Sequence, residues 1–184
     1  MTSPKNDIHD YVLVYNAHTQ EECNSFIEEL EKSNWSPHTW YQNRTNIFAD
    51  RKDFSVQNNV EVQNKMREGF ISAIKHYFKT VTSDITDQFN FSAVRFNKYD
   101  TGESIKHHVD HIHSIFDGKR KGIPIMSFVG VFNDDYEGGE FILAGKEYPL
   151  KAGDVIMFPS VFLYPHEVKP ITSGVRYSWV LWAY

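Results

Sequence analysis

The 184-residue sequence predicts a single domain of the α+β class, with its helices in the first part of the chain and its strands in the second. Two observations predict this order. Apolar residues recur at helical spacing before residue 80, whereas short β-branched and aromatic runs alternate with turn residues after residue 90. An aromatic content of 15% suits the second part, because aromatic rings pack well on a pleated sheet.

Two helices are expected in the first part. Thr19 and Glu22 form a capping-box pattern that starts the first helix, and helical spacing continues to about Ser33. The second helix is expected over Val60–Phe78, where an apolar residue at every fourth position forms a stripe suited to packing on a sheet. Two short strands are expected in the same part of the chain, at Tyr11–Tyr15 and Arg44–Ala49.

Eight strand-like runs fill the second part, separated by turn residues roughly every 8–12 residues, which indicates a sandwich or barrel. Trp179 and Trp182 near its end are expected to pack in the core. Neither a repeat nor a linker interrupts the chain, so residues 1–80 are expected to support residues 90–184 within one domain. The expected strands are Phe91–Tyr99, Ser104–His111, Pro124–Phe132, Glu140–Leu143, Glu147–Leu150, Asp154–Phe158, Tyr164–Val168 and Ser173–Trp182, with turns at Asp100–Gly102, Asn133–Gly139, Ala144–Gly145, Ala152–Gly153 and Thr172–Gly174.

Charge and cysteine content restrict the class of protein. The net charge of −5 gives no overall basic balance, which disfavours a nucleic acid as the partner. The single cysteine, Cys23, cannot form an internal disulfide and indicates a reducing compartment. The N-terminus has no apolar signal region and no run approaches a membrane span, so a cytoplasmic protein is expected.

Candidate metal ligands lie in the segment Lys106–His113, which holds four of the 9 histidines. In a strand His108 and Asp110 share a face, with their Cα atoms roughly 6.5–7 Å apart, while His107 points the other way. An imidazole beside a carboxylate provides two ligands of the facial triad that non-haem iron(II) oxygenases use. His166 is the candidate third ligand, although this set of ligands alone also suits zinc.

Arg176 and Ser178 form a candidate carboxylate receptor. On a strand they share a face, and a guanidinium donates two parallel hydrogen bonds to a carboxylate. A receptor of this kind near an iron site predicts a dicarboxylate that chelates the metal at one end and binds Arg176 at the other.

The order of these residues resembles the 2-oxoglutarate/iron(II) dioxygenases, in the prolyl 4-hydroxylase-like branch. The resemblance covers about residues 90–184. It implies a double-stranded β-helix, the jelly-roll type of cupin domains, as the core of the fold. The family's motifs match, in order, Tyr99, Gly102, His108 and Asp110, then Gly138-Gly139-Glu140, then Gly153-Asp154 through Phe158-Pro159-Ser160, and finally His166, Pro170, Gly174 and Arg176.

The resemblance also implies the activity and its cofactors. His108, Asp110 and His166 would be both the catalytic and the metal residues, holding iron(II), while Tyr99, Arg176 and Ser178 would bind 2-oxoglutarate. O2 would be the second co-substrate, ascorbate is a candidate additional cofactor, and succinate and CO2 would be products. A protein or peptide substrate, most plausibly at proline, is the leading expectation.

Three positions depart from the prolyl hydroxylase pattern. Arg176 stands where a lysine is usual, Ile105 where a second tyrosine is usual, and Tyr177 where a tryptophan is frequent. The alternatives are therefore a dioxygenase of a free amino acid, small metabolite or nucleobase, and a non-catalytic cupin-like module that has kept a metal site. Arg176 disfavours the module, because metal binding alone needs no dicarboxylate receptor.

Overall fold

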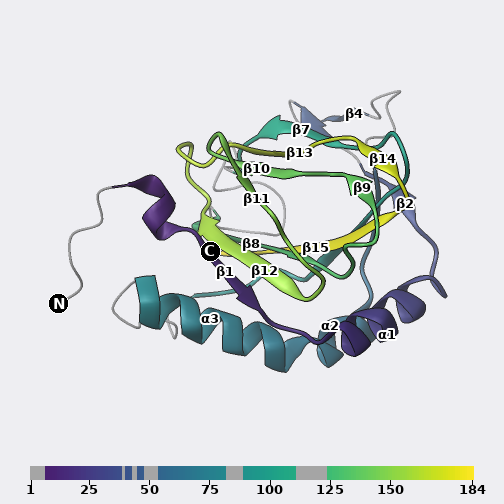
Figure 1. Ribbon diagram of the computed structural model, residues 1–184, viewed down its shortest axis with the longest axis horizontal. Helices are drawn as coiled ribbons and strands as arrows, with labels where there is room; N and C mark the ends of the chain where they lie inside the picture. The colour runs from purple at the N-terminus through teal and green to yellow at the C-terminus, as the bar shows by residue number, and fades with distance from the viewer. Residues whose placement is uncertain (1–6, 39, 43–44, 48–53, 82–88, 111–123) are drawn as a thin grey trace.

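The computed structural model describes residues 7–38, 40–42, 45–47, 54–81, 89–110 and 124–184. Figure 1 shows three layers: the helices lie along one side, a large sheet lies in the middle, and a smaller sheet covers its other face. This arrangement is an α+β fold with two facing antiparallel sheets, as the strand and helix order of the sequence predicts.

The helices are named in chain order, and all of them precede strand β6. They comprise a 3-10 helix at Ile8–Tyr11 and the α-helices α1 (Gln20–Leu30), α2 (Val60–Lys65) and α3 (Arg67–Val81). The strands are β1 (Leu13–Asn16), β2 (Ser36–Pro37), β3 (Trp40–Gln42), β4 (Thr45–Ile47), β5 (Ser55–Gln57), β6 (Arg95–Tyr99), β7 (Ile105–His108), β8 (Met126–Val131), β9 (Glu137–Gly138), β10 (Phe141–Leu143), β11 (Lys146–Tyr148), β12 (Asp154–Pro159), β13 (His166–Val168), β14 (Ile171–Ser173) and β15 (Arg176–Ala183).

Helix α1 begins where the capping-box pattern predicts. The Thr19 hydroxyl accepts from the Glu22 backbone N–H, and the Glu22 carboxylate accepts from the Thr19 backbone N–H. Cys23 on its inner face is fully buried, and this burial raises the pKa of the thiol to about 12.

The single helix predicted over Val60–Phe78 is wrong in one respect, because Met66 divides it into α2 and α3. Met66 has ψ near −1°, which interrupts regular α-geometry, although hydrogen bonds to Val62 and from Phe70 continue on either side. Asn59, rather than a serine or threonine, caps the start of α2 by accepting from the Val62 backbone N–H.

The larger sheet has seven strands in the order β1-β12-β8-β15-β6-β5-β2, and the smaller has four in the order β11-β10-β13-β7. Two two-stranded ribbons, β14-β9 and β3-β4, complete the topology. The strands from β6 to β15 that form both sheets fall within the eight predicted runs, apart from Lys146 and the ends Pro159 and Ala183.

Two short strands lie in or overlap segments that the sequence predicts as turns. Strand β9 falls inside the expected turn at Asn133–Gly139, and β14 overlaps the one at Thr172–Gly174. They pair with each other, with Ile171 opposite Gly138. Strands this short carry no period-two apolar pattern, so the sequence gives no signal for them.

Successive side chains of the central strands point to opposite faces of the sheet and contribute to two separate hydrophobic cores. Residues facing the helices, such as Phe128, Met157 and Trp179, join α1–α3 in one core, as expected for Trp179. Their neighbours Val129 and Ile156 face the smaller sheet in the other core. Because both faces of the large sheet are covered, polar residues on its inner face are enclosed in the molecule.

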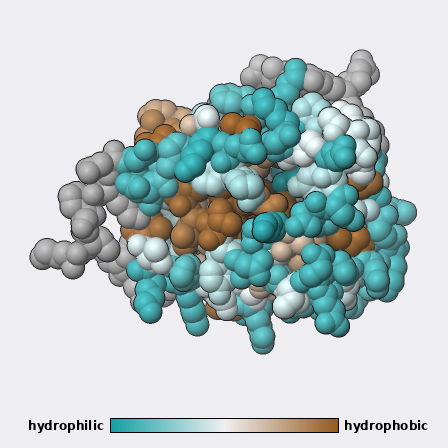
Figure 2. All heavy atoms as spheres, in the orientation of Figure 1, coloured by the Kyte–Doolittle hydropathy of each residue, from teal (hydrophilic) through white to brown (hydrophobic). Residues whose placement is uncertain are grey.

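The outer surface of the helical layer is hydrophilic. In Figure 2 the edge of the molecule formed by the helices is mostly teal, while brown residues gather in the hollow in the middle of this view. Among the helices that the structure describes, none is long and apolar enough to cross a membrane.

Gly153 lies just before β12 and hydrogen-bonds the residues that precede α1, so its close packing provides a test of the fold. Its carbonyl accepts from Ala17 and His18, and a Cβ at this position would lie 1.9 Å from the His18 carbonyl oxygen. Gly145 has a similar positive φ of 78°, but a Cβ there meets nothing within 4 Å.

We expect Gly153→Ala to destabilise the protein by at least about 3 kcal/mol, because a backbone carbonyl must move. The control Gly145→Ala bears only the left-handed backbone strain, about 1–2 kcal/mol. Urea unfolding followed by circular dichroism measures both values. Equal losses for the two variants would contradict the close packing at Gly153.

Candidate metal centre and carboxylate site

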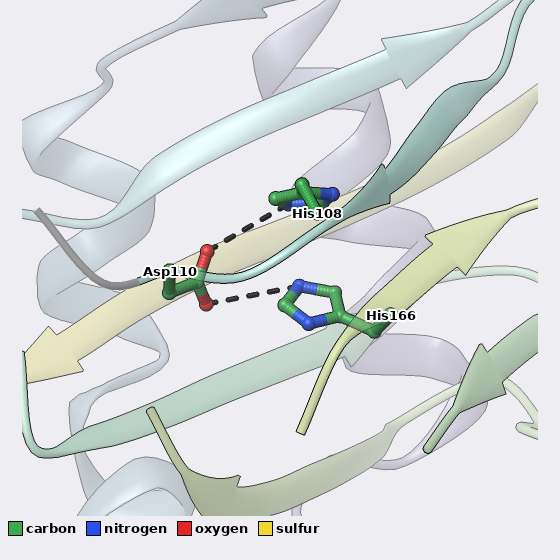
Figure 3. Close-up of side chains that lie close together, drawn as sticks. All are labelled: His108, Asp110 and His166. Carbon is green, nitrogen blue, oxygen red and sulfur yellow. Dashed lines mark ion pairs between the residues drawn. The ribbon is translucent and has the colours of Figure 1, made fainter. Parts of the chain in front are cut away.

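Three side chains from the smaller sheet and its edge converge on one point (Figure 3). Strand β13 pairs with β7 so that His166 lies opposite His108, and their ring centroids are 4.3 Å apart. Asp110 Oδ1 lies 3.7 Å from His108 Nε2, and its Oδ2 lies 3.7 Å from His166 Nε2. The three ligand atoms all lie within 4.8 Å of one another, a separation suited to a single metal ion.

Asp110 reaches this point from beyond the end of a strand. The expectation that one strand carries both His108 and Asp110 is wrong, because β7 ends at His108. The carboxylate is oriented instead by strand β8, whose Ser127 hydroxyl donates a 2.6 Å hydrogen bond to Asp110 Oδ2. Ser160 in turn lies 2.7 Å from the Ser127 hydroxyl, so a chain of polar groups holds the carboxylate.

Backbone carbonyls set the tautomers of both histidines. The Nδ1 atoms of His108 and His166 lie 2.7 Å from the Lys106 carbonyl and 3.2 Å from the Tyr164 carbonyl. A carbonyl only accepts, so each Nδ1 carries the proton and each Nε2 presents a lone pair towards Asp110. Two nitrogen lone pairs with a carboxylate oxygen between them are a set of ligands that fits a divalent transition metal ion.

The pKa values of His108 and Asp110 favour the forms of these two residues that bind a metal ion. Burial, together with the neighbouring His166, lowers the pKa of His108 to about 4, which keeps this imidazole neutral. Burial alone would raise the pKa of Asp110, but the two imidazoles and the Ser127 hydrogen bond hold it below its usual value. A carboxylate and a neutral imidazole are the forms that bind a metal ion.

The residues of the predicted carboxylate receptor lie together on the large sheet, facing the same cavity. Arg176 and Ser178 are each 1% exposed, and Arg176 Nη1 donates a 2.8 Å hydrogen bond to the Ser178 hydroxyl. Tyr99 lies opposite Arg176 in the β6–β15 register, with its ring centroid 5.3 Å from the guanidinium carbon. A fourth residue, Tyr136, accepts a 3.2 Å hydrogen bond from Arg176 Nε.

A cavity between the two sheets connects the metal point to Arg176. Its lining includes His108, Asp110 and His166 on one side and Arg176 and Ser178 on the other. It holds about 30 Å³, room for roughly one or two water molecules. A dicarboxylate therefore enters only if lining side chains shift.

The sequence analysis assigns no site role to four residues that lie at the site. Ser127 and Tyr136 contact Asp110 and Arg176 through packing between strands distant in the sequence, and no motif spacing marks them. Arg95 lines the cavity from β6, and Trp182, expected only to pack, presents its ring 5.1 Å from the Arg95 guanidinium carbon. Their positions on the inner face could have been read from period two, since Arg95 and Trp182 lie an even number of residues from Tyr99 and Arg176. His107, which the sequence analysis places on the face of the strand opposite the metal ligands, is exposed.

Comparison with known families identifies a match in the second half of the chain. The sequence model of the 2OG-Fe(II) oxygenase superfamily matches residues 94–184. This range contains the metal point, the Arg176 receptor and the residues between them.

Curated relatives are PKHD-type hydroxylases. One from Acinetobacter baumannii is 36% identical over 94 residues, which cover 47% of this chain and 40% of the relative. Another, from Shewanella sp. strain MR-7, is 27% identical over 178 residues, covering 93% of this chain and 76% of the relative. The chain therefore spans less than half the length of the Acinetobacter relative that it matches.

Solved structures with a similar fold include prolyl hydroxylases. A prolyl hydroxylase from Trichoplax adhaerens, in complex with a peptide fragment of hypoxia inducible factor, matches with a TM-score of 0.70 and 15% identity, covering 95% of this chain and 84% of that one. A viral collagen prolyl hydroxylase from Paramecium bursaria Chlorella virus-1 matches with a TM-score of 0.64 and 17% identity, covering 94% of each chain. At these identities the likeness shows a shared fold, which is the double-stranded β-helix that the sequence predicts.

Removal of one histidine tests the metal point. We expect His108→Ala to weaken Mn(II) binding by at least roughly 100-fold. Loss of a residue that only hydrogen-bonds a metal ligand already lowers metal affinity by about 10–100-fold. His107→Ala is the matched control, since His107 is exposed on the same strand. Isothermal titration calorimetry measures both affinities, and equal weakening by the two substitutions would place the metal elsewhere.

The lowered pKa of His108 predicts a pH dependence of stability in the metal-free protein. The folded-state pKa of about 4 lies below the ordinary 6.5. At pH values between the two, the unfolded chain therefore binds a proton that the folded chain does not. Stability is retained above pH 6.5 and falls as the pH falls towards 4. We expect a loss of about 2 kcal/mol between pH 7 and pH 5 from this group.

Urea unfolding at both pH values, with wild type and His108→Gln, isolates this contribution. The variant should lack about 2 kcal/mol of the wild-type dependence on pH, whereas His107→Gln should retain it. An unchanged dependence in His108→Gln would show that this imidazole titrates normally.

Proposed function

Because the chain belongs to the 2OG-Fe(II) oxygenase superfamily, we propose that it is an iron(II)- and 2-oxoglutarate-dependent hydroxylase of the prolyl 4-hydroxylase-like kind. The observation that carries this proposal is the buried Arg176, which faces the metal point across a shared cavity. A protein that only bound a metal would gain nothing from a buried guanidinium there, because an enclosed charge is costly unless it meets an anion.

The metal residues in this proposal are His108, Asp110 and His166. Their Nε2 atoms and carboxylate would hold iron(II), with Ser127 fixing the carboxylate. When bound, iron(II) with 2-oxoglutarate and O2 supplies the oxidising power that hydroxylates an unactivated carbon and yields succinate and CO2. The set of ligands also suits zinc, but family membership favours iron.

The co-substrate residues are Arg176, Ser178 and Tyr99, which would receive the carboxylate of 2-oxoglutarate that lies farthest from the metal. Tyr136 and Ser178 hold Arg176 at Nε and Nη1, so the planar fork has a defined direction before the co-substrate binds. The Tyr99 ring supports the guanidinium through a cation–π contact. Preorganised groups of this kind lower the entropy cost of binding.

The rest of the chain supports the site. We propose that residues 1–80 and 90–184 act as one domain, because α1–α3 pack on the large sheet from the side opposite the cavity. This packing excludes water from the back of the site, and the smaller sheet covers its front.

A peptide substrate is the favoured candidate, since the Trichoplax structure of similar fold holds a peptide. The second candidate is a free amino acid or another small molecule. Ile105 lines the cavity where prolyl hydroxylases usually carry a tyrosine, so this wall differs from theirs. A base within a nucleic acid is disfavoured by the net charge of −5.

The activity is tested by succinate formation from 2-oxoglutarate under air. We expect succinate with Fe(II) and none with Zn(II), because zinc has no redox chemistry. Arg176→Met should raise the KM for 2-oxoglutarate by roughly 10-fold or more, because loss of a charge-assisted pair costs about 1.5–3 kcal/mol. Lys98→Met is the matched control, since Lys98 lies on the same sheet but binds Glu31 on its outer face.

Two results would contradict the proposed function. One is equal succinate formation with Fe(II) and Zn(II), which would leave no role for iron. The other is an unchanged KM in Arg176→Met, which would remove the guanidinium from the co-substrate site.

A further inference from the structure

Two buried hydroxyl groups form a chain that ends at the Asp110 carboxylate. Ser127 and Ser160 are 0% and 2% exposed. Ser127 lies on β8 and Ser160 follows β12, and the pairing of these strands, with Phe158 opposite Ser127, brings the two hydroxyls to within 2.7 Å of each other. The Ser160 backbone N–H donates to the Ile125 carbonyl, so the end of the strand pair holds Ser160 in place.

The protons of this chain can run in one direction only. The pKa of Asp110 is held low, so its carboxylate is ionised and only accepts hydrogen bonds. The Ser127 hydroxyl therefore gives its proton to Asp110 Oδ2, 2.6 Å away. A hydroxyl has a single proton, so the Ser127 oxygen must accept from Ser160. Ser160 thus keeps the Ser127 proton directed at Asp110.

The metal point itself does not distinguish the two oxygens of Asp110. Oδ1 lies 3.7 Å from His108 Nε2, and Oδ2 lies 3.7 Å from His166 Nε2 (Figure 3). A carboxylate in this position could offer a metal ion either one oxygen or both. The Ser127 hydrogen bond removes this symmetry, because it is made to Oδ2 and is strengthened by the charge of the carboxylate.

The number of oxygens that Asp110 provides decides how much of the metal ion stays open. Two imidazoles and one carboxylate oxygen fill half the positions of an octahedral ion and leave the other half open. In the proposed function, 2-oxoglutarate and O2 need all of these open positions. A second bond from Asp110 would close one of them, and 2-oxoglutarate would have to displace it.

We propose that Ser127 and Ser160 are positioning residues that reserve Oδ2 of Asp110 for the protein, so that Asp110 gives the metal ion a single oxygen. A position on the metal ion then stays open for 2-oxoglutarate. The claim about 2-oxoglutarate rests on the proposed function, whereas the claim about the carboxylate needs only a bound metal ion.

The water bound to Mn(II) tests the claim about the carboxylate without co-substrate or turnover. Mn(II) relaxes the protons of bulk water in proportion to the number of water molecules that it binds and exchanges. We expect Ser127→Ala to lower this relaxation, measured per bound Mn(II), by about one third, because the freed Oδ2 replaces one of about three waters. Ser92→Ala should leave it unchanged, because the Ser92 hydroxyl is also buried but bonds backbone groups only.

The affinity for 2-oxoglutarate at saturating Mn(II) tests the second claim. Isothermal titration calorimetry should show binding at least about tenfold weaker in Ser127→Ala, because 2-oxoglutarate must displace the second carboxylate oxygen. Ser127→Thr keeps the hydroxyl and should restore both the affinity and the water count. Ser160→Ala leaves the Ser127 proton in place, so both of its values should lie between those of wild type and Ser127→Ala.

A role confined to holding the carboxylate in place would lower the affinity for Mn(II) alone, and that result overturns the inference. Wild-type water relaxation in folded Ser127→Ala, or an equal loss in Ser92→Ala, overturns it as well. If circular dichroism shows that Ser127→Ala does not fold, Ser127→Cys replaces it, because a thiol is a weak donor. Wild type that binds Mn(II) but no 2-oxoglutarate would contradict the proposed function, while the water count would still decide the claim about the carboxylate.

Discussion

The pairing of β13 with β7 is the constraint on which the rest of the site depends. It places His166 opposite His108, although the two residues are far apart in the sequence. A slip of one residue would turn one imidazole to the other face of the sheet and leave Asp110 beside a single imidazole. The carbonyls of Lys106 and Tyr164 then fix both tautomers, so the same backbone that sets the register also prepares the nitrogen donors.

The large sheet forms the wall of the cavity that faces the metal ligands. Its outer face is covered by α1–α3, so its inner face is free to carry polar groups within the protein. Arg176 is a buried charge that would destabilise an apolar core, but Ser178 and Tyr136 accept its hydrogen bonds and Tyr99 packs against its plane. In the proposed function, the far carboxylate of 2-oxoglutarate meets this cation and offsets the cost of its burial.

The sequence predicts the class of fold and the candidate site residues because both leave ordered patterns along the chain. Period two identifies the strands, and ordered motifs locate His108, His166 and Arg176. The contacts of Ser127 and Tyr136 depend on how distant strands pack, which spacing does not encode. The break at Met66 and the short strands β9 and β14 are set by backbone geometry rather than by an apolar pattern.

A crystal structure with Mn(II) and 2-oxoglutarate, grown without oxygen, tests the central claim most directly. The account predicts a metal bonded to Nε2 of His108, Nε2 of His166 and the Asp110 carboxylate, with the far carboxylate of 2-oxoglutarate on Arg176. A metal bound away from these three residues, or a 2-oxoglutarate whose far carboxylate does not reach Arg176, would contradict it.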